Sequence, residues 1–104
     1  MWARVSRFDE PKDRIDDDIR MTRSNVVDLV NSTSGSEGVY YMVDRETGRA
    51  MAVTLWDSKE SLLASEREAA RIREQSTSAI GGTITGVEHY EVVLQPSDMM
   101  ANAT

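Results

Sequence analysis

The chain has 104 residues, of which 39% are hydrophobic and 29% charged, a composition that fits one small globular domain and excludes a disordered or membrane-embedded protein. It contains no cysteine, which excludes disulfides, thiolate nucleophiles and cysteine-ligated metal sites. The formal net charge of -6 disfavours nucleic acid and membranes as partners, so we expect a neutral or apolar ligand. No apolar run approaches the roughly 18 residues of a spanning helix, and the N-terminus lacks the apolar centre of a signal peptide, so we expect a cytoplasmic location. We also expect no cofactor.

The first predicted strand covers residues 2–8, where alternate side chains fall on two faces that are both mixed in polarity. Arg4 shares its face with an aromatic residue at either end of the strand, and Arg7 lies on the opposite face. These arginines either hold an anionic oxygen of a substrate or mark the edge of a sheet. Pro11 then suits the first turn of a helix, which we expect over residues 11–31.

This helix has an apolar stripe on one side and acidic residues on the other. The stripe consists of Ile15, Ile19, Val26 and Val30. Residues 16–18 are three consecutive aspartates, a run that could suggest a metal site. Consecutive helical residues point about 100° apart, so they cannot converge on one ion, and we expect them to face solvent.

A hairpin follows the loop at residues 31–38. Its strands are predicted at residues 39–43 and 50–56, which are rich in β-branched and aromatic side chains, and its turn at 44–49 has Gly48 available for positive φ. Asp57 precedes Glu60 by three residues, the spacing of a helix N-cap and its N3 partner. A second helix is therefore expected from residue 58 to residue 76 or somewhat beyond.

The last predicted strand covers residues 87–95 and is closed by Pro96. One of its faces is wholly apolar, and the other carries His89 between valines. Residues 96–104 are expected to form a flexible tail. The expected organisation is thus one domain over residues 1–95 followed by this tail.

The order of elements is strand, helix, strand, strand, helix, strand, which predicts an α+β ferredoxin-like βαββαβ fold. Right-handed crossovers would place both helices on one face of a four-stranded antiparallel sheet. The two hairpin strands are apolar on both of their faces, so the uncovered face needs a partner. We expect a homodimer that closes sheet against sheet into a dimeric α+β barrel.

Three segments carry a resemblance to a known family. They read GVYYMVDRETGR at residues 38–49, TLWDSKESL at 54–62 and VEHYEV at 87–92. This pattern resembles the antibiotic biosynthesis monooxygenase family of dimeric α+β barrels, and the likeness extends over residues 2–95. It implies a ligand cavity in each subunit between the sheet and the helices. Members of this family range from cofactor-free oxygenases of phenols and quinones, through haem degraders, to proteins without known activity.

The resemblance also implies site residues. Trp56 matches the Trp that lines the pocket of the oxygenases, and Ala52 stands where those enzymes have an Asn. Leu62 and Ser76 lie near the places of a helical Tyr and Arg. The resemblance thus makes Trp56 a candidate catalytic residue. Two further candidates come from the residues themselves: His89, the only histidine, whose imidazole suits a general base, and Tyr40, which could assist proton removal. The candidate substrate-binding residues are Trp56, Tyr40, Arg4, Ala52 and Leu62.

Each of these candidates also has a structural interpretation. Trp56 ends a strand, where Trp is commonly part of the core, and His89 could be a structural imidazole at a dimer interface. Tyr40 and Tyr41 point to opposite faces, so at most one of them lines a cavity.

The family's haem-degrading branch is disfavoured. The Asn, Trp and axial His of that branch would fall at Ser6, Ser65 and Gln75, none of which can replace the imidazole ligand. The first remaining hypothesis is a cofactor-independent monooxygenase of a phenolic, quinol-like or other aromatic small molecule. The second, favoured by Ala52, is a non-catalytic dimeric protein that binds an apolar metabolite. A third, a subunit with a purely assembling role, stays open at this point.

Overall fold

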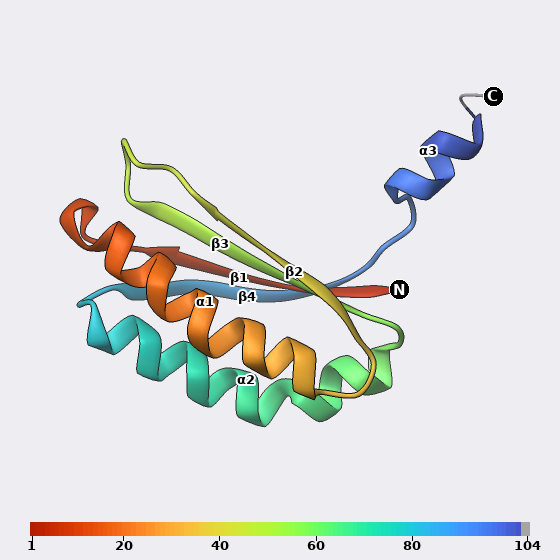
Figure 1. Ribbon diagram of the computed structural model, residues 1–104, viewed down its shortest axis with the longest axis horizontal. Helices are drawn as coiled ribbons and strands as arrows, with labels where there is room; N and C mark the ends of the chain where they lie inside the picture. The colour runs from red at the N-terminus through yellow and green to blue at the C-terminus, as the bar shows by residue number, and fades with distance from the viewer. Residues whose placement is uncertain (103–104) are drawn as a thin grey trace.

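The computed structural model describes the backbone of residues 1–102 and the side chains of residues 1–99. Its four strands form one antiparallel sheet in the order β2-β3-β1-β4, with two long helices on one face (Figure 1). The predicted α+β ferredoxin-like order is confirmed. The strands are β1 (Trp2–Asp9), β2 (Ser36–Val43), β3 (Arg49–Trp56) and β4 (Thr83–Glu91). The helices are the 3-10 turn η1 (Lys12–Arg14), α1 (Ile15–Ser32), α2 (Lys59–Ala79) and α3 (Pro96–Asn102).

The hairpin between β2 and β3 closes as predicted. Asp44 N donates to Arg49 O at 2.8 Å, and Gly48 N donates to Asp44 O at 2.8 Å. Gly48 has a φ of +81°, and a Cβ there would lie 2.3 Å from the carbonyl oxygen of Glu10. Glycine is needed for both reasons. The hairpin also holds the end of β1, because Glu10 N donates to Gly48 O at 2.8 Å.

The first helix differs from the prediction at its start and in its acidic run. A 3-10 turn intervenes after Pro11, so the α-helix begins at Ile15. The expectation that residues 16–18 all face solvent is wrong for Asp18, which is only 5% exposed. At 100° per residue, Asp18 falls on the same side as Ile15 and Thr22, the side that packs on the sheet.

The second helix is capped one residue later than predicted. Ser58, and not Asp57, is the N-cap, because its Oγ accepts a hydrogen bond from Ser61 N at 3.1 Å. Asp57 N instead donates to Gly35 O at 2.8 Å, which ties it to the preceding loop.

The C-terminal part departs furthest from the sequence expectation. β4 begins at Thr83, four residues before the predicted start, because residues 83 and 84 pair with the end of β1. Residues 96–102 form the helix α3, which projects from the body of the molecule in Figure 1. The flexible tail expected over residues 96–104 stays a prediction, and residues 103 and 104 lie outside the described residues. Pro96 suits the first helical turn, and the Asp98 carboxylate accepts a hydrogen bond from Gln95 N at 3.0 Å.

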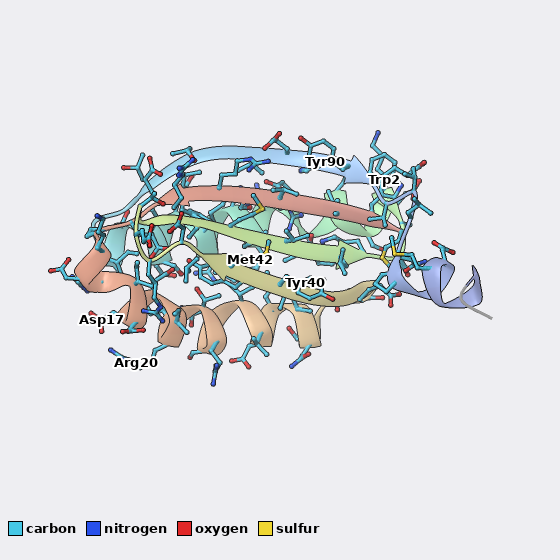
Figure 2. The ribbon with its side chains drawn as sticks, turned by 90° about the horizontal axis from the view of Figure 1, so that it is seen from above. Trp2, Asp17, Arg20, Tyr40, Met42 and Tyr90 are labelled. Carbon is cyan, nitrogen blue, oxygen red and sulfur yellow. The ribbon has the colours of Figure 1, made fainter. Side chains whose placement is uncertain are left out.

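The two faces of the sheet differ in how they are covered. Trp56 and Leu62 are fully buried on the helix side. The opposite face is open and bears Tyr40, Met42 and Tyr90, which are 61%, 49% and 48% exposed (Figure 2). Among residues 1–102, none of the helices is long and apolar enough to cross a membrane.

Candidate functional site

A cavity of about 60 Å³ lies between the helix-covered face of the sheet and the two long helices. Most of its wall is apolar, and polar side chains gather in two clusters along it. The apolar wall is formed by Phe8, Val26, Leu29, Ala52, Ala69, Ile72 and Ile80. This is the place where the resemblance implies a ligand site.

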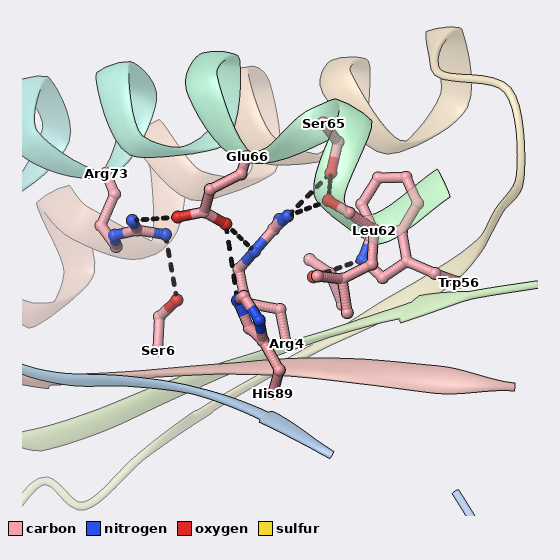
Figure 3. Close-up of polar contacts among 9 residues, drawn as sticks. Arg4, Ser6, Trp56, Leu62, Ser65, Glu66, Arg73 and His89 are labelled. Carbon is pink, nitrogen blue, oxygen red and sulfur yellow. Dashed lines mark hydrogen bonds and ion pairs between the residues drawn. The ribbon is translucent and has the colours of Figure 1, made fainter. Parts of the chain in front are cut away.

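The first polar cluster, which we call the arginine cluster, consists of Arg4, Glu66, Arg73 and His89 (Figure 3). Arg4 Nε lies 2.6 Å from Glu66 Oε2, and Arg73 NH2 lies 3.0 Å from Glu66 Oε1. His89 Nε2 lies 3.7 Å from Glu66 Oε2. Arg73 also reaches Ser6 Oγ at 3.5 Å. One carboxylate on α2 thus joins side chains from β1, β4 and α2 itself.

Arg4 is the most deeply placed member, with 2% of its side chain exposed. Its NH2 donates to Leu62 O at 2.7 Å and to Ser65 Oγ at 2.8 Å, and its Cζ lies 5.5 Å from the centre of the Trp56 ring. Burial lowers the pKa of Arg4, an effect that the charge of Glu66 opposes. The guanidinium nevertheless remains charged, as arginine does in proteins.

The arginine cluster carries an excess of one positive charge, because two arginines share one carboxylate. Partial burial tends to raise the pKa of Glu66. The hydrogen bond from Arg73 and the charges of Arg4 and Arg73 outweigh this effect, so the pKa of Glu66 is lowered. Glu66 is therefore ionised at neutral pH, and the cavity has a cationic end.

The second cluster, the carboxyl cluster, consists of Glu10, Asp18 and Tyr41. Tyr41 Oη lies 2.7 Å from Glu10 Oε1 and is also within hydrogen-bond distance of Asp18 Oδ2. Glu10 and Asp18 are 8% and 5% exposed. The three side chains come from the end of β1, from α1 and from β2, and all of them line the cavity.

The carboxyl cluster has two close oxygen–oxygen contacts, but the Tyr41 hydroxyl supplies a proton for only one of them. Burial and the neighbouring Asp18 raise the pKa of Glu10 from 4.5 to about 7, although the hydrogen bond from Tyr41 acts in the opposite direction. Burial and the two carboxyl groups raise the pKa of Tyr41 well above its usual range, so its hydroxyl stays protonated. That one proton can be donated to only one carboxylate at a time. The other close contact is favourable only when a carboxyl group is itself protonated.

Apart from Arg4 Nε, which forms the ion pair with Glu66, two buried polar atoms of the cavity wall have no hydrogen-bond partner among the described residues. They are Glu10 Oε2 and Ser76 Oγ, on residues that are 8% and 9% exposed. Buried polar groups are usually paired. These atoms are therefore places where a ligand could donate or accept a hydrogen bond.

The structure places the predicted site residues in three different environments. Arg4 and Ala52 line the cavity. Trp56 and Leu62 are fully buried beside Arg4 and do not belong to the cavity wall, and Trp56 Nε1 donates to Thr54 Oγ1 at 3.0 Å. These two residues lie next to Arg4 without reaching the cavity, and they help to hold Arg4 in place.

His89 and Tyr40 lie outside the cavity wall. His89 contacts Glu66 from the edge strand β4, with 31% of its side chain exposed. Tyr40 is on the open face, and its neighbour Tyr41 is the tyrosine that lines the cavity. Neighbouring residues of a strand point to opposite faces, so Tyr40 must lie on the open face when Tyr41 faces the helices.

The polar cavity residues that the prediction missed include the charged or aromatic residues Glu10, Asp18, Tyr41 and Arg73. Arg73 had a detectable signal, because it follows Glu66 by seven residues and so returns to the same helix face. Glu10 had none, since an acidic residue before a proline is typical of a surface turn.

The arrangement offers no evident metal site. Within the described residues, no group of three His, Asp or Glu side chains could hold an ion. The three positions that the resemblance assigned to haem chemistry also serve other roles. Ser6 and Ser65 contact Arg73 and Arg4, and Gln75 is exposed beside Arg71.

Comparison with known proteins identifies the fold. No protein-family model matches the chain. The uncharacterised protein Rv2557 of Mycobacterium tuberculosis is 30% identical over 98 residues, which cover 94% of this chain and 43% of that protein. The chain thus spans less than half the length of the curated relatives it matches.

Solved structures show the same architecture at low identity. A Deinococcus radiodurans protein named a "putative antibiotic biosynthesis monooxygenase" has a TM-score of 0.72 at 9% identity, over 91% of this chain and 95% of that one. The Streptomyces coelicolor monooxygenase from the gene ActVA-Orf6, in complex with nanaomycin D, has a TM-score of 0.66 at 13% identity, over 91% of each chain. The chain therefore has the fold of the antibiotic biosynthesis monooxygenases, and the resemblance is confirmed at that level.

Proposed function

We propose that the protein is a cofactor-independent monooxygenase of a small phenolic, quinol-like or other aromatic molecule bound in the cavity. The observation that carries the proposal is the cavity itself, in which apolar walls join a cationic end to an acidic end. Oxygenation without a cofactor requires a substrate that becomes an anion and passes an electron to O₂. The protein then has to bind the ring, exclude water and stabilise negative charge.

The arginine cluster supports the charge-stabilising role. Its excess positive charge, on Arg4 and Arg73, lies at the cavity wall and is only partly neutralised by Glu66. An oxyanion of the substrate placed there would gain a charge-assisted hydrogen bond in a site sheltered from water. For an anthrone-type substrate, the ring CH₂ group and O₂ give a carbonyl group and water, so one oxygen atom enters the product.

The size of the cavity sets a condition on this proposal. Its 60 Å³ is less than the roughly 150 Å³ of an engineered cavity that admits benzene. Binding of an aromatic ring therefore requires the wall to move outward. The side chains of Val26 and Leu29 on α1 are the natural part of the wall to move, because they carry no hydrogen bond.

Oxygen consumption with anthrone and a series of hydroquinones tests the proposal. Metal-free protein should consume O₂ above the rate without protein, and Arg73→Met should lower this activity at least tenfold. Arg71→Met is the matched control, because Arg71 is exposed on the same helix. No uptake by the unsubstituted protein with any of these compounds would contradict the proposal.

A non-catalytic binding protein of the same fold is the second candidate. It is favoured by the position of Trp56, which is fully buried outside the cavity wall, and by Ala52 in place of the Asn that the resemblance would supply. Saturable quenching of tryptophan fluorescence by these compounds, without oxygen uptake, would identify this alternative.

We also propose that two copies pair through the open face of the sheet, in the cytoplasm. The large apolar side chains Tyr40, Met42 and Tyr90 on that face are about half exposed or more in the single chain. Sedimentation at micromolar concentration should give twice the monomer mass, and Met42→Glu should abolish the dimer. Leu63→Glu is the control, since Leu63 is equally exposed at 51% but lies on α2. A monomeric parent protein would refute this pairing.

A further inference from the structure

The proposed reaction needs a group that accepts a proton, and the cavity contains an unassigned one. Glu10 lies at the end of β1 with its Oε2 buried and without a partner among the described residues. Ser76 presents a second unpartnered oxygen from α2, on the other side of the same cavity. Two buried atoms on different elements, both left without partners, point to a ligand that meets each of them.

The surroundings of Glu10 favour proton exchange over a purely structural role. Within residues 1–99, no lysine or arginine forms an ion pair with Glu10 or Asp18, in contrast to Glu66. The titratable and charged groups that line the same cavity are Asp18 on α1, Tyr41 on β2, Arg73 on α2 and Arg4 on β1. A buried acid beside a second acid holds a proton more tightly than an isolated one.

We propose that Glu10, held by Asp18 and Tyr41, is the proton acceptor of the cavity and selects ligands that present a weakly acidic hydroxyl group. The inference rests on the proposed function. The substrate O–H bond breaks, the proton passes to Glu10 Oε2, and the electron pair stays on the substrate oxygen as a phenolate. No electron is transferred in this step.

The remaining wall groups orient this ligand. The Tyr41 hydroxyl lies beside Glu10 Oε1, whereas Glu10 Oε2 has no hydrogen-bond partner among the described residues. Ser76 offers a hydroxyl to a second oxygen atom of the ligand. A small ring with two oxygen functions, as in a quinol, has a group for each of the two unpartnered atoms. The backbone bond from Glu10 to Gly48 holds the acceptor in place.

The acceptor supports general-base catalysis near neutral pH. A base is most effective when its pKa lies near the working pH, and the pKa of Glu10 is about 7. The rate of oxygenation should therefore rise with pH and level off above that value. Glu10→Gln should lower kcat about a hundredfold and remove this pH dependence.

Binding of 4-nitrophenol tests the acceptor without any oxidation, because the absorbance of this probe reports whether its hydroxyl is ionised. At pH 7.5 both Glu10 and the free probe are mostly ionised, so their contact requires one shared proton, and binding to the parent protein should take up a proton from a weakly buffered solution. Glu10→Gln should bind the probe as phenolate without this proton uptake. The matched control is Glu46→Gln in the exposed hairpin turn, which should match the parent protein.

If Glu10→Gln folds poorly, a second variant tests the acceptor. Tyr41→Phe should move the ionisation of the bound probe to lower pH, because loss of the hydrogen bond from Tyr41 raises the pKa of Glu10 and makes it a stronger proton acceptor. Circular dichroism confirms the fold of each variant.

The outcomes separate the two proposals. Glu10-dependent proton uptake on binding of 4-nitrophenol, without oxygen uptake from any quinol, would support the acceptor and refute the oxygenase. Oxygen uptake that depends on Arg73 but is unchanged in rate and pH profile by Glu10→Gln would support the oxygenase and refute the acceptor. Equal behaviour of the parent protein and Glu10→Gln toward the probe, including no binding by either, would overturn the acceptor.

Discussion

The arginine cluster and the carboxyl cluster both contribute side chains to the wall of one cavity, yet they differ in how their charges are compensated. In the arginine cluster, Glu66 is shared by two guanidinium groups, and Arg4 also has a backbone carbonyl and a serine as acceptors. In the carboxyl cluster, two acids depend on the single hydroxyl proton of Tyr41. The first cluster therefore links helix to sheet, whereas the second is a stability cost that a protonated or ligand-bound state relieves.

The largest effect is expected when the arginine cluster is broken at Arg4. Arg4→Ala removes the ion pair to Glu66 and the hydrogen bonds that Arg4 donates to Leu62 O and Ser65 Oγ. We expect the free energy of unfolding to fall by about 3–5 kcal/mol, as for other buried pairs that lose one partner. Urea unfolding at pH 7 measures this change.

The matched control for Arg4 is Arg71→Ala. Arg71 forms an exposed ion pair with Glu68 on the outer side of α2, so its loss should change stability by less than about 0.5 kcal/mol. Equal effects of the two substitutions would show that the buried arginine cluster does not link β1 to α2.

The carboxyl cluster should behave in the opposite sense, because removing its charge stabilises the protein. The pKa of Glu10 is raised to about 7, so between pH 4.5 and 7 the folded state binds more protons than the unfolded state. Stability therefore falls as the pH rises through this window. Glu10→Gln should remove the fall and stabilise the protein at pH 8 by on the order of 2 kcal/mol.

Unfolding midpoints in urea at pH 5, 6, 7 and 8 test this pH dependence. Glu46→Gln serves again as the control, because it removes the same charge from an exposed turn. A parent protein whose stability rises steadily from pH 5 to pH 8, with the same rise in Glu10→Gln, would show that Glu10 is not held in its protonated form.

Removal of the tyrosine hydroxyl should have a smaller effect. Tyr41→Phe deletes the only donor that links the two carboxyl groups, and we expect a loss of about 1 kcal/mol at pH 5. Because Tyr41 lowers the pKa of Glu10, the pH window of falling stability should also extend above pH 7. NMR of the carboxyl carbon follows the titration of Glu10. A titration midpoint that is the same in Tyr41→Phe and in the parent protein would contradict this role of Tyr41.

The contrast between the clusters also explains what sequence alone could predict. The hairpin turn with Gly48 and the two long helices follow from local chemistry, and both were predicted. Strand alternation placed Arg4 correctly on the face of Ser6 and Phe8. Features that depend on neighbouring residues in the sequence could therefore be predicted from the sequence.

The carboxyl cluster could not be predicted from the sequence, because it depends on contacts between distant segments. Glu10 and Asp18 belong to stretches that are typical of a surface turn and an exposed helix face. They are buried because Gly48 binds the end of β1 and because α1 packs its Asp18 side on the sheet. Alternation could show that only one of Tyr40 and Tyr41 faces the cavity, but the choice depends on which face the helices cover.

His89 provides the finest test of the comparison, because it joins the arginine cluster only at its margin. It lies 3.7 Å from an oxygen of Glu66 that Arg4 already contacts at 2.6 Å, and a third of its side chain is exposed. His89→Gln should therefore change the free energy of unfolding by less than about 0.5 kcal/mol at pH 7. It should also leave oxygen uptake and the ionisation of bound 4-nitrophenol unchanged. A loss of uptake with unaltered stability would instead make His89 the base, as the sequence suggested, and would remove that role from Glu10.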